Sequence, residues 1–314
     1  MISQMMESKV EMCLITGSSG FIGRHLLNAV ELAEIDFEVL KYSKNDGCVT
    51  LPGRDTPIVI HLAGRAHVLN ETSASPYEEF YKANCDFALR VAKAAAKQGL
   101  KRFVYVSSIG VYGKSSSSGS ISENSHLTPV EDYAKSKLEA ERQLTALSKE
   151  LGFELVIVRP ALVYGFDAPG NIERLLNLTS KLPIIPIAER KNRRSFVYVE
   201  NLVDFLLLVA THPNAAGKSF NIADDAISTH DLIDGFAKGM GRSPLLFSFP
   251  RFFWKALLRL AGKQKMYEQL FEDLMLDMSL AETELGWKPA HDAAAALQAT
   301  GKRFLYAKQQ APSN

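Results

Sequence analysis

Short runs of apolar residues alternate, along the first half of the chain, with longer stretches in which apolar residues recur every three or four positions. The short runs are typical of buried strands, and the longer stretches are typical of helices with one apolar face. We expect strands over 10–15, 37–42, 57–62, 102–107 and 153–159, and helices over 21–30, 77–98 and 133–151. This alternation predicts an α/β fold built on a parallel, doubly wound sheet.

The pattern is less regular in two places. Residues 43–57 would have to contain both a strand over 48–51 and the connections on either side of it. A full crossover helix needs about ten residues or more, so the connection to any such third strand is abbreviated. After Tyr164 we expect helices over 171–182 and 201–210, and the remainder is rich in helical patterns. We interpret this second half as a smaller region beside the carboxyl edge of the sheet.

Length and composition are those of an ordinary globular protein. The 314 residues suggest about two domains, and 46% hydrophobic with 23% charged residues is typical of such proteins. Lysine and arginine number 36 and aspartate and glutamate 35, which gives a formal net charge of +1. This balance gives no reason to expect nucleic-acid binding.

The cysteines and the distribution of apolar residues favour a cytoplasmic protein. Cys13, Cys48 and Cys85 are far apart and odd in number, so they form neither a metal-binding CxxC pair nor a disulfide framework. Residues 1–9 contain Glu7 and no long apolar core, and we therefore expect no secretory signal. No run approaches about 18 apolar residues, so no transmembrane helix is expected.

A glycine-rich stretch, LITGSSGFIG over 14–23, separates the first expected strand from the first helix. Gly17 permits a tight turn, Gly20 leaves the backbone accessible to a pyrophosphate, and Gly23 lets the helix lie close to the sheet. The free N–H groups and the dipole of the helix N-terminus favour the same anion. The spacing is GxxGxxG and not GxGxxG, so by itself it fits a dinucleotide site and a ligand-free turn equally well.

A tyrosine and a lysine one helical turn apart follow a strand that ends in two serines. Tyr133 and Lys137 form YxxxK and lie on the same face of the expected helix. An ammonium group at this distance favours the phenolate and lowers the tyrosine pKa, which is otherwise about 10. Lys137 can also hydrogen-bond a ribose hydroxyl. Ser107 and Ser108 stand at the carboxyl end of a strand, where ligands bind in such sheets.

Each of these motifs also has a structural interpretation: YxxxK as a surface pair, and the two serines as a strand-to-loop stop. A serine hydroxyl at that strand end can, however, meet the same substrate oxygen as Tyr133. Glycine turn, serine pair and YxxxK occur in the right order, each at its expected structural position, and together they favour a catalytic site.

These and further motifs resemble the extended short-chain dehydrogenase/reductases, and within them the NAD-dependent epimerase/dehydratase (nucleotide-sugar) family. The matching pieces are TGSSGFIG at 16–23, HLAG at 61–64, Asn84 in KANCDFAL, VSSIGVYG at 106–113, YAKSK at 133–137, VRPALVYG at 158–165, RRSFVYVENLVD at 193–204 and LGWKP at 285–289. They keep the family's order over nearly the whole chain. Within the family, the resemblance is to bacterial UDP-N-acetylhexosamine 4-epimerases and to 4-keto reductases that form UDP-N-acetylquinovosamine. These enzymes share the sequence motif RRSxVxxxNLVD with this chain.

The resemblance implies roles for individual residues. Tyr133 would be the acid/base, Lys137 its electrostatic partner and ribose anchor, and Ser108, four residues before Tyr112, the hydroxyl on the reacting oxygen. It implies that NAD or NADP contacts Gly17, Gly20, Phe21, Ile22, Gly23, Ser43, Lys44, Leu62, Ala63, Gly64, Asn84, Tyr133, Lys137, Pro160 and Val163. A UDP-sugar would contact Ser108, Asn171 and Arg194, and an arginine suits a diphosphate physically. The alternative for Arg194 is a surface arginine of the basic run 190–194.

Two positions depart from the family's pattern. Its 4,6-dehydratases carry Asp-Glu after the active-site hydroxyl residue, whereas Ile109 and Gly110 can do no acid–base work here, so dehydratase activity is not expected. The acidic residue expected about 20 positions after the fingerprint is replaced by Ser43 and Lys44, which favours acceptance of NADP. Asp46, a few residues later, could still serve NAD.

The resemblance divides the chain into a dinucleotide-binding domain over 1–165, with a return through 196–222, and a substrate-binding region over 166–195 and 223–314. It implies hydride transfer at C4 of a UDP-sugar, by a 4-epimerase or by a 4-keto-sugar reductase with the same residues, and it is compatible with a homodimer. Metal and nucleic acid are not expected. The alternatives are a non-catalytic dinucleotide sensor, which the intact Ser108, Tyr133 and Lys137 disfavour, and a dehydrogenase of a non-sugar substrate, which Asn171 and Arg194 disfavour.

A basic and aromatic helix is expected over 251–259, within RFFWKALLRL. Arg251, Lys255 and Arg259 recur every four residues, with apolar residues between them. The pattern fits a membrane-surface helix. It also fits a solvated basic face on a helix that packs by its other side, and we prefer this interpretation.

Overall fold

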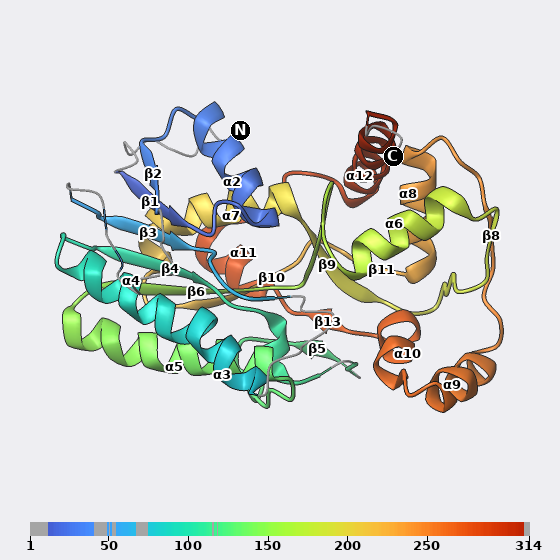
Figure 1. Cartoon of the computed structure of the whole chain (residues 1–314), viewed down its shortest axis with the longest axis horizontal. Coiled ribbons are helices and arrows are strands. Elements are labelled where there is room, and N and C mark those ends of the chain that lie inside the picture. The colour runs from blue at the N-terminus through green and yellow to red at the C-terminus, as the bar shows by residue number, and fades with distance from the viewer. Residues whose placement is uncertain are drawn as a thin grey trace.

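The computed structural model describes residues 12–40, 49, 51, 55–66, 75–114, 116–117 and 119–310. A parallel sheet with helices on both faces occupies one side of the molecule, and a smaller, helix-rich region occupies the other (Figure 1). This is the predicted α/β architecture. No described helix is both long and apolar enough to cross a bilayer.

The large sheet has six parallel strands in the order β10-β6-β4-β3-β1-β2. They are β1 (Cys13–Thr16), β2 (Phe37–Val39), β3 (Ile58–His61), β4 (Arg102–Val106), β6 (Glu154–Pro160) and β10 (Ser219–Ile222). From β1 the chain goes to β2 on one side, and then to β3 on the other side. Ligands of open α/β sheets bind at the carboxyl ends of the strands where the order reverses in this way.

Four helices cover the two faces of this sheet: α2 (Phe21–Leu32), α4 (Phe87–Ala96), α5 (Asp132–Leu151) and α7 (Val199–Thr211). Successive strand side chains point to opposite faces. Leu14 accordingly packs in the core cluster formed with α4 and α5, whereas Ile15 packs in the cluster formed with α2 and α7. Because both faces are buried, the strands are apolar at nearly every position, which is the pattern that the sequence displays.

The expected helix over 77–98 consists of three consecutive segments: α3 (Pro76–Tyr81), a π-helical turn (Lys82–Asp86) and α4. A π turn contains one residue more than an α turn and is frequent at functional sites. It carries the fully buried Asn84, whose carbonyl accepts a hydrogen bond from the Tyr105 hydroxyl at 3.1 Å. Hydrophobic periodicity did not indicate this irregularity.

The second region is built on a three-stranded sheet of β7 (Leu162–Tyr164), β9 (Arg194–Tyr198) and β11 (Ala226–Ile227). Its main helices are α6 (Asn171–Lys181), α8 (Thr229–Gly239) and α12 (Ala293–Gln310). Helices α8 and α12 lie in backbone contact, since a Cβ on Gly301 would lie 2.2 Å from the Phe236 carbonyl oxygen. Gly235 and Gly239 of α8 likewise lie against α12, so all three glycines are packing positions.

Several further elements complete the described part of the chain. They are β5 (Ser120–Ile121), β8 (Ile184–Ile185), β12 (Leu245–Leu246), α9 (Arg251–Leu260), α10 (Gln264–Phe271), β13 (Met275–Leu276), α11 (Ser279–Leu285) and two 3-10 turns (Ile109–Tyr112 and Pro213–Ala215). Strand β13 pairs with β5, and β12 with β8. Helices α9 and α10 form a hairpin on the side of the molecule away from the large sheet (Figure 1).

Within the expected return over 196–222, α7 packs on the large sheet and β10 pairs with β6, whereas the end of β9 belongs to the three-stranded sheet. The domain boundaries themselves stay predictions. The expected third strand over 48–51 lies partly outside the described residues. Val49 and Leu51 are described, neither lies in a strand, and both pack against the core cluster beneath α4.

Candidate active site

The turn from β1 to α2 is a closely packed glycine loop at the carboxyl edge of the sheet. Gly17 has a φ of +73°, and a Cβ there would lie 2.5 Å from the Ala63 nitrogen and 2.7 Å from the Leu62 carbonyl carbon. A Cβ on Gly23 would lie 2.2 Å from the Gly17 oxygen. A side chain at Gly17 would collide with the segment after β3, and one at Gly23 would push the helix away from the loop.

Gly20 leaves the N-terminus of α2 accessible. It is the residue directly before the helix, it is exposed, and no described side chain caps the first turn. Uncapped N–H groups at a helix N-terminus, together with the helix dipole, bind anions. The loop therefore fits a pyrophosphate.

A buried threonine and a buried histidine fix the strand ends beside this loop. Thr16 Oγ1 lies 3.0 Å from His61 Nδ1 and accepts a hydrogen bond from the Ala63 nitrogen at 3.2 Å. The His61 ring stacks on Phe103 and Tyr105, and burial lowers its pKa to about 3, so it is neutral. Sequence analysis missed both residues, although HLAG contains the histidine.

Asn84 joins the segment after β3 to helix α5. Its side-chain nitrogen donates to Ser136 Oγ at 2.9 Å and to the Arg65 carbonyl at 3.2 Å. Its Oδ1 accepts from the Arg65 nitrogen at 2.7 Å. A Cβ on Gly64 would lie 2.7 Å from Asn84 Oδ1 and 3.3 Å from Lys137 Nζ. The structure thus brings Gly64, Asn84 and Lys137 together.

The Ser108 hydroxyl lies near the Tyr133 phenol, close enough to favour its phenolate form. Ser108 comes shortly after β4, and its hydroxyl also accepts from the Gly110 nitrogen at 3.1 Å. Burial raises the pKa of the Tyr133 phenol to about 12, and the nearby Ser108 hydroxyl opposes this in part. The lowered pKa that we expected from Lys137 is therefore wrong for the chain by itself, because desolvation dominates.

Lys137 is buried one turn further along α5. Its Nζ donates to the Val106 carbonyl at 2.8 Å and lies 4.8 Å from the centre of the Tyr105 ring. Burial lowers the Lys137 pKa to about 8, and Glu141 opposes this in part. The ammonium group thus lies against the end of β4 and near Gly64, on the side expected for a ribose.

A buried ion pair fixes the middle of α5, and sequence analysis did not find it. Arg159 Nε and Nη2 donate to the two carboxylate oxygens of Glu141 at 3.0 and 2.6 Å. Arg159 Nη1 donates to the Tyr112 hydroxyl at 2.9 Å, and that hydroxyl donates to Asn221 Oδ1 at 2.8 Å. The network ties α5 to β6, to β10 and to the 3-10 turn that follows Ser108.

The start of α2 also meets the segment after β6. Phe21, Ile22 and Val163 pack against one apolar cluster that contains Tyr164. Pro160 is buried at the end of β6. These four expected cofactor residues therefore lie in two adjoining segments next to the glycine loop.

Asn171 and Arg194, expected to hold a diphosphate, both contact α10. Asn171 Nδ2 donates to Gln269 Oε1 at 3.1 Å. Arg194 Nη1 donates to the carbonyls of Glu268 and Glu272, at 3.1 and 2.9 Å, at the end of the helix. Arg194 is buried, which lowers its pKa to about 10. The alternative of a solvated surface arginine is therefore wrong.

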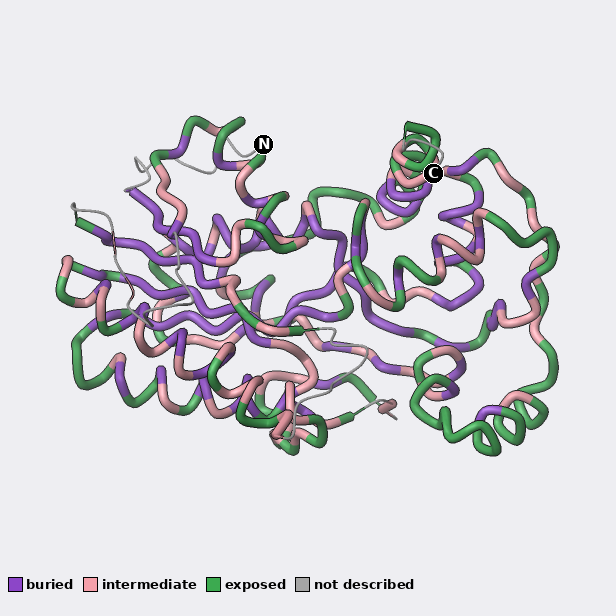
Figure 2. The backbone as a smooth tube through the Cα atoms, viewed as in Figure 1, coloured by how far each residue is buried: buried purple, intermediate pink, exposed green. Residues whose placement is uncertain are grey.

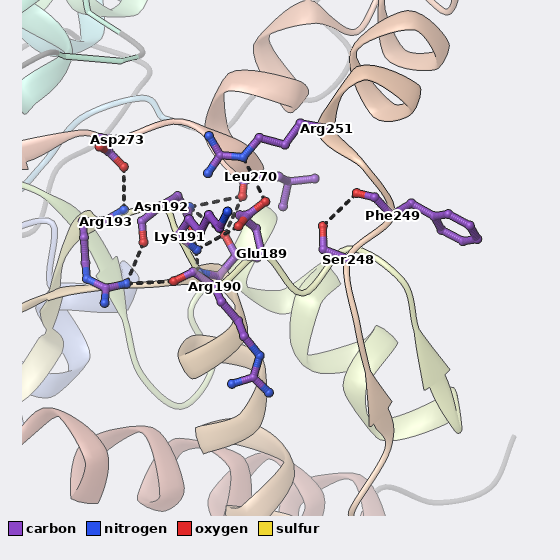
Figure 3. Close-up of polar contacts among 11 residues, drawn as sticks. Glu189, Arg190, Lys191, Asn192, Arg193, Ser248, Phe249, Arg251, Leu270 and Asp273 are labelled. Atoms are coloured by element: carbon purple, nitrogen blue, oxygen red, sulfur yellow. Dashed lines mark hydrogen bonds and ion pairs between the residues drawn. The ribbon is translucent and has the colours of Figure 1, made fainter.

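The loop before Arg194 is held to the α9–α10 hairpin by polar contacts (Figure 3). Glu189 Oε2 accepts from Arg251 Nε at 3.0 Å, and the Arg193 nitrogen donates to Asp273 Oδ1 at 2.7 Å. A cleft opens beside these contacts and is lined by Ser116, Ser117, Lys191, Arg251, Glu272 and Asp273. Ser43 and Lys44 lie outside the described residues, so their contact with a cofactor stays a prediction.

Comparison with known proteins supports one family. The sequence model of the NAD dependent epimerase/dehydratase family matches residues 13–223. A UDP-glucose 4-epimerase from Vibrio cholerae is 33% identical over 318 positions, which cover 95% of this chain and 96% of that protein.

Two solved structures have the same fold. RMD from Pseudomonas aeruginosa, complexed with NADPH, matches with a TM-score of 0.76 and 20% identity over 95% of this chain and 100% of that one. UDP-glucuronic acid 4-epimerase from Bacillus cereus, in complex with NAD, matches with a TM-score of 0.71 and 20% identity over 95% and 99%. Because the family's model spans more than half of the chain and the Vibrio relative nearly all of it, the chain belongs to the NAD dependent epimerase/dehydratase family of enzymes.

Proposed function

We propose that this protein transfers hydride at C4 of a UDP-sugar, as a 4-epimerase or a 4-keto-sugar reductase. The observation that carries the proposal is the proximity of Ser108 and Tyr133 beside the buried Lys137, whose Nζ donates to the Val106 carbonyl. The Vibrio cholerae relative, named UDP-glucose 4-epimerase, supports the first of the two reactions. The glycine loop, the uncapped helix and the close approach of Gly64 to Asn84 fit a dinucleotide.

In this proposal Ser108 and Tyr133 act on one substrate oxygen. When bound, the nicotinamide ring accepts or returns the hydride of the sugar's C4. Tyr133 takes the proton of the O4 hydroxyl as the C4–H bond breaks, and Ser108 hydrogen-bonds the resulting 4-keto oxygen. Tyr133 returns the proton to O4 as hydride re-forms the C4–H bond. Return on the opposite face inverts C4, whereas a reductase performs the second half alone.

Tyr133 must lose its proton to act as the base. Its pKa of about 12 means that the phenolate needs a nearby positive charge. Lys137, with a pKa of about 8, carries a proton on most molecules at neutral pH. We therefore assign Lys137 two tasks, to favour the phenolate and to hydrogen-bond a ribose hydroxyl.

Arg194 and Asn171 are proposed to hold the diphosphate of the substrate. A buried guanidinium whose pKa is lowered by desolvation is stabilised when an anion approaches it. Arginine also matches phosphate oxygens in a bidentate manner. We propose in addition that NADP(H) is accepted at least as well as NAD(H), because Ser43 and Lys44 replace the carboxylate that would repel a 2′-phosphate.

The experiment is to incubate the protein with UDP-GlcNAc, UDP-glucose or a UDP-4-keto sugar, each with NAD(H) and NADP(H), and to identify the products by NMR. Inversion at C4 identifies an epimerase, and reduction of the keto sugar alone identifies a reductase. Tyr133→Phe should lower turnover by about 10²–10⁴-fold and leave cofactor binding nearly intact. Tyr306→Phe, at an exposed tyrosine of α12, is the matched control and should turn over normally.

Titration of both cofactors into the apo protein tests the choice between them. Cofactor binding without turnover of any UDP-sugar would favour the dinucleotide sensor, and oxidation of a non-sugar alcohol would favour the other dehydrogenase alternative. Either result overturns the proposal. Normal turnover of Tyr133→Phe would remove Tyr133 from the mechanism.

A further inference from the structure

Helix α9 presents an apolar stripe to solvent. Phe252 and Leu260 have 76% and 88% of their surface exposed, and Phe253 and Leu257 have 46% and 45%. With Ala256 these residues follow one another at alternating steps of one and three positions, so they share the outer face of the helix. Large apolar side chains gathered on one exposed face commonly mark an interaction site. The exposed face of α9 is therefore apolar as well as basic.

The opposite face of α9 holds the helix in this orientation. Leu258 packs with Tyr267 and Phe271 of α10, and Trp254 stacks on the Phe271 ring at 6.1 Å between centres. Arg251 is paired with Glu189 of the body of the protein (Figure 3). The stripe thus cannot turn inward without breaking these contacts.

Aromatic residues before α9 extend the apolar surface. The rings of Phe247 and Phe249 lie 5.4 Å apart, those of Phe249 and Phe253 lie 5.6 Å apart, and all three side chains are exposed. Figure 3 shows the Phe249 side chain pointing away from the polar cluster. Figure 2 shows the same corner of the molecule, at the lower right, mostly exposed.

The charged residues of the segment that carries the stripe are of one sign, and acidic residues from other segments pair with two of them, Arg251 and Lys265. Residues 241–267 contain six lysines and arginines and no aspartate or glutamate. Lys255 and Arg259 lie one turn apart on the flank of the stripe, and Lys263 follows in the turn to α10. No described acidic side chain pairs with these three cations. An apolar face bordered by cations is complementary to an anionic lipid surface.

We propose that α9 is a membrane-surface helix that docks the protein on an anionic bilayer. The apolar stripe enters the headgroup boundary, and the flanking cations remain at the level of the lipid phosphates. A projecting helix at the corner of the molecule suits a flat, deformable surface, whereas a protein partner would have to supply a matching groove (Figure 1). Because α10 contacts Asn171 and Arg194, docking would also bring the proposed substrate end near the bilayer.

Vesicle flotation of the full chain tests this inference without reference to activity. The protein should float with phosphatidylcholine vesicles that contain phosphatidylglycerol, and not with phosphatidylcholine alone. Phe252→Glu/Leu260→Glu should abolish flotation, and Arg259→Gln/Lys263→Gln should weaken it roughly tenfold or more. Leu32→Glu, at an exposed leucine of α2, and Arg142→Gln/Lys149→Gln on α5 are the matched controls and should float like the wild type.

All the substituted residues are exposed, so unchanged melting temperatures should confirm that the variants fold. A wild-type protein that does not float with the anionic vesicles overturns the proposal, as does a Phe252→Glu/Leu260→Glu variant that floats normally. Light scattering distinguishes the other occupant of such a face. If the wild type does not float and the same variant converts a dimer into a monomer, the stripe is an interface between copies.

Discussion

Burial of Lys137 costs the protein stability, and its proposed function requires that burial. Its ammonium group is buried against the end of β4, and desolvation lowers its pKa from 10.5 to about 8. A lysine placed only for stability would keep its charge in water. The position next to Gly64 makes sense when a ligand hydroxyl is to be bound there.

Replacing Lys137 by methionine should raise the free energy of unfolding of the cofactor-free protein at neutral pH. Below pH 8 the wild type bears the full desolvation cost, and as pH rises from about 8 to 10.5 the folded state loses its proton first, so stability rises and the cost disappears. The gain should be on the order of 1–3 kcal/mol at pH 7. Urea unfolding at a series of pH values measures it.

The advantage of Lys137→Met should vanish above pH 10.5, where the wild-type lysine is neutral in both states. Leu138→Met, a neighbouring buried position, controls for the methionine and should show no such pH dependence. A difference that stays constant with pH, or a less stable Lys137→Met at neutral pH, contradicts the argument.

Sequence analysis identified Ser108, Tyr133 and Lys137 because motif order and strand-end position are local properties. It did not give the direction of the Tyr133 pKa, since that depends on burial by residues distant in the sequence. It also missed the contact of Thr16 with His61, which are 45 residues apart. The hydrophobic periodicity of a single helix or strand carries no information about contacts between residues so far apart in the sequence.

At the scale of elements, helix α5 carries the proposed catalytic residues on its first two turns and a buried ion pair on the third. Glu141 and Arg159 have almost no exposed surface and meet in a bidentate arrangement. Such a pair adds little net stability compared with apolar residues, but removing one partner leaves a buried charge uncompensated. The pair therefore fixes the position of α5 against β6.

Glu141→Gln should lower the free energy of unfolding by about 3–5 kcal/mol, because the Arg159 charge is left without its counter-charge. Denaturant titration measures this. Glu154→Gln removes the carboxylate from a comparable pair with Arg102, but Glu154 is half exposed, so this control should cost about 1 kcal/mol or less. Equal losses in the two variants would show that burial does not set the contribution of these pairs.

Arg194 links a strand of the second region to helix α10. Arg194→Ala should weaken UDP binding far more than cofactor binding, because the guanidinium is the proposed phosphate ligand. Calorimetry with UDP and with each cofactor measures the two affinities. Arg193→Ala, at the exposed neighbour, should leave both unchanged.

Because Arg194 also holds the end of α10, the alanine variant is expected to be less stable as well. Arg194→Lys keeps a charge and should recover part of the UDP affinity. If the Arg194→Ala variant folds and binds UDP as tightly as the wild type, Arg194 does not bind the diphosphate and only holds the end of α10.

For the whole molecule, the alternation of strands and helices predicted the large sheet and the helices that cover it. The glycine loop and the strand ends lie where the order of strands predicts a ligand. The second region was less predictable. Its short strands and the hairpin of α9 and α10 depend on contacts between segments far apart, such as those of Arg194 with Glu268 and Glu272.

Hydrogen exchange should separate the two ligand sites. A bound ligand suppresses local opening of the backbone around it. The cofactor alone should slow exchange at the start of α2 and over 62–66, and UDP alone should slow exchange in α10 and over 193–198. The last turn of α5, over 148–151, lies about 15 Å or more beyond Lys137 along the helix and serves as the internal control. Protection by UDP confined to the glycine loop would contradict the placement of the diphosphate near Arg194.

The π turn at Lys82–Asp86 restricts insertions and deletions in the helical segment from α3 to α4. Each residue of an α-helix advances the rotation by about 100°, so the one extra residue sets a fixed angular offset between α3 and α4. Deleting it would restore a regular helix but would rotate either Asn84 or the buried face of Val91 and Ala95 away from its partners. Exposed positions such as Lys93 should therefore tolerate substitution, whereas this segment should resist the gain or loss of a single codon.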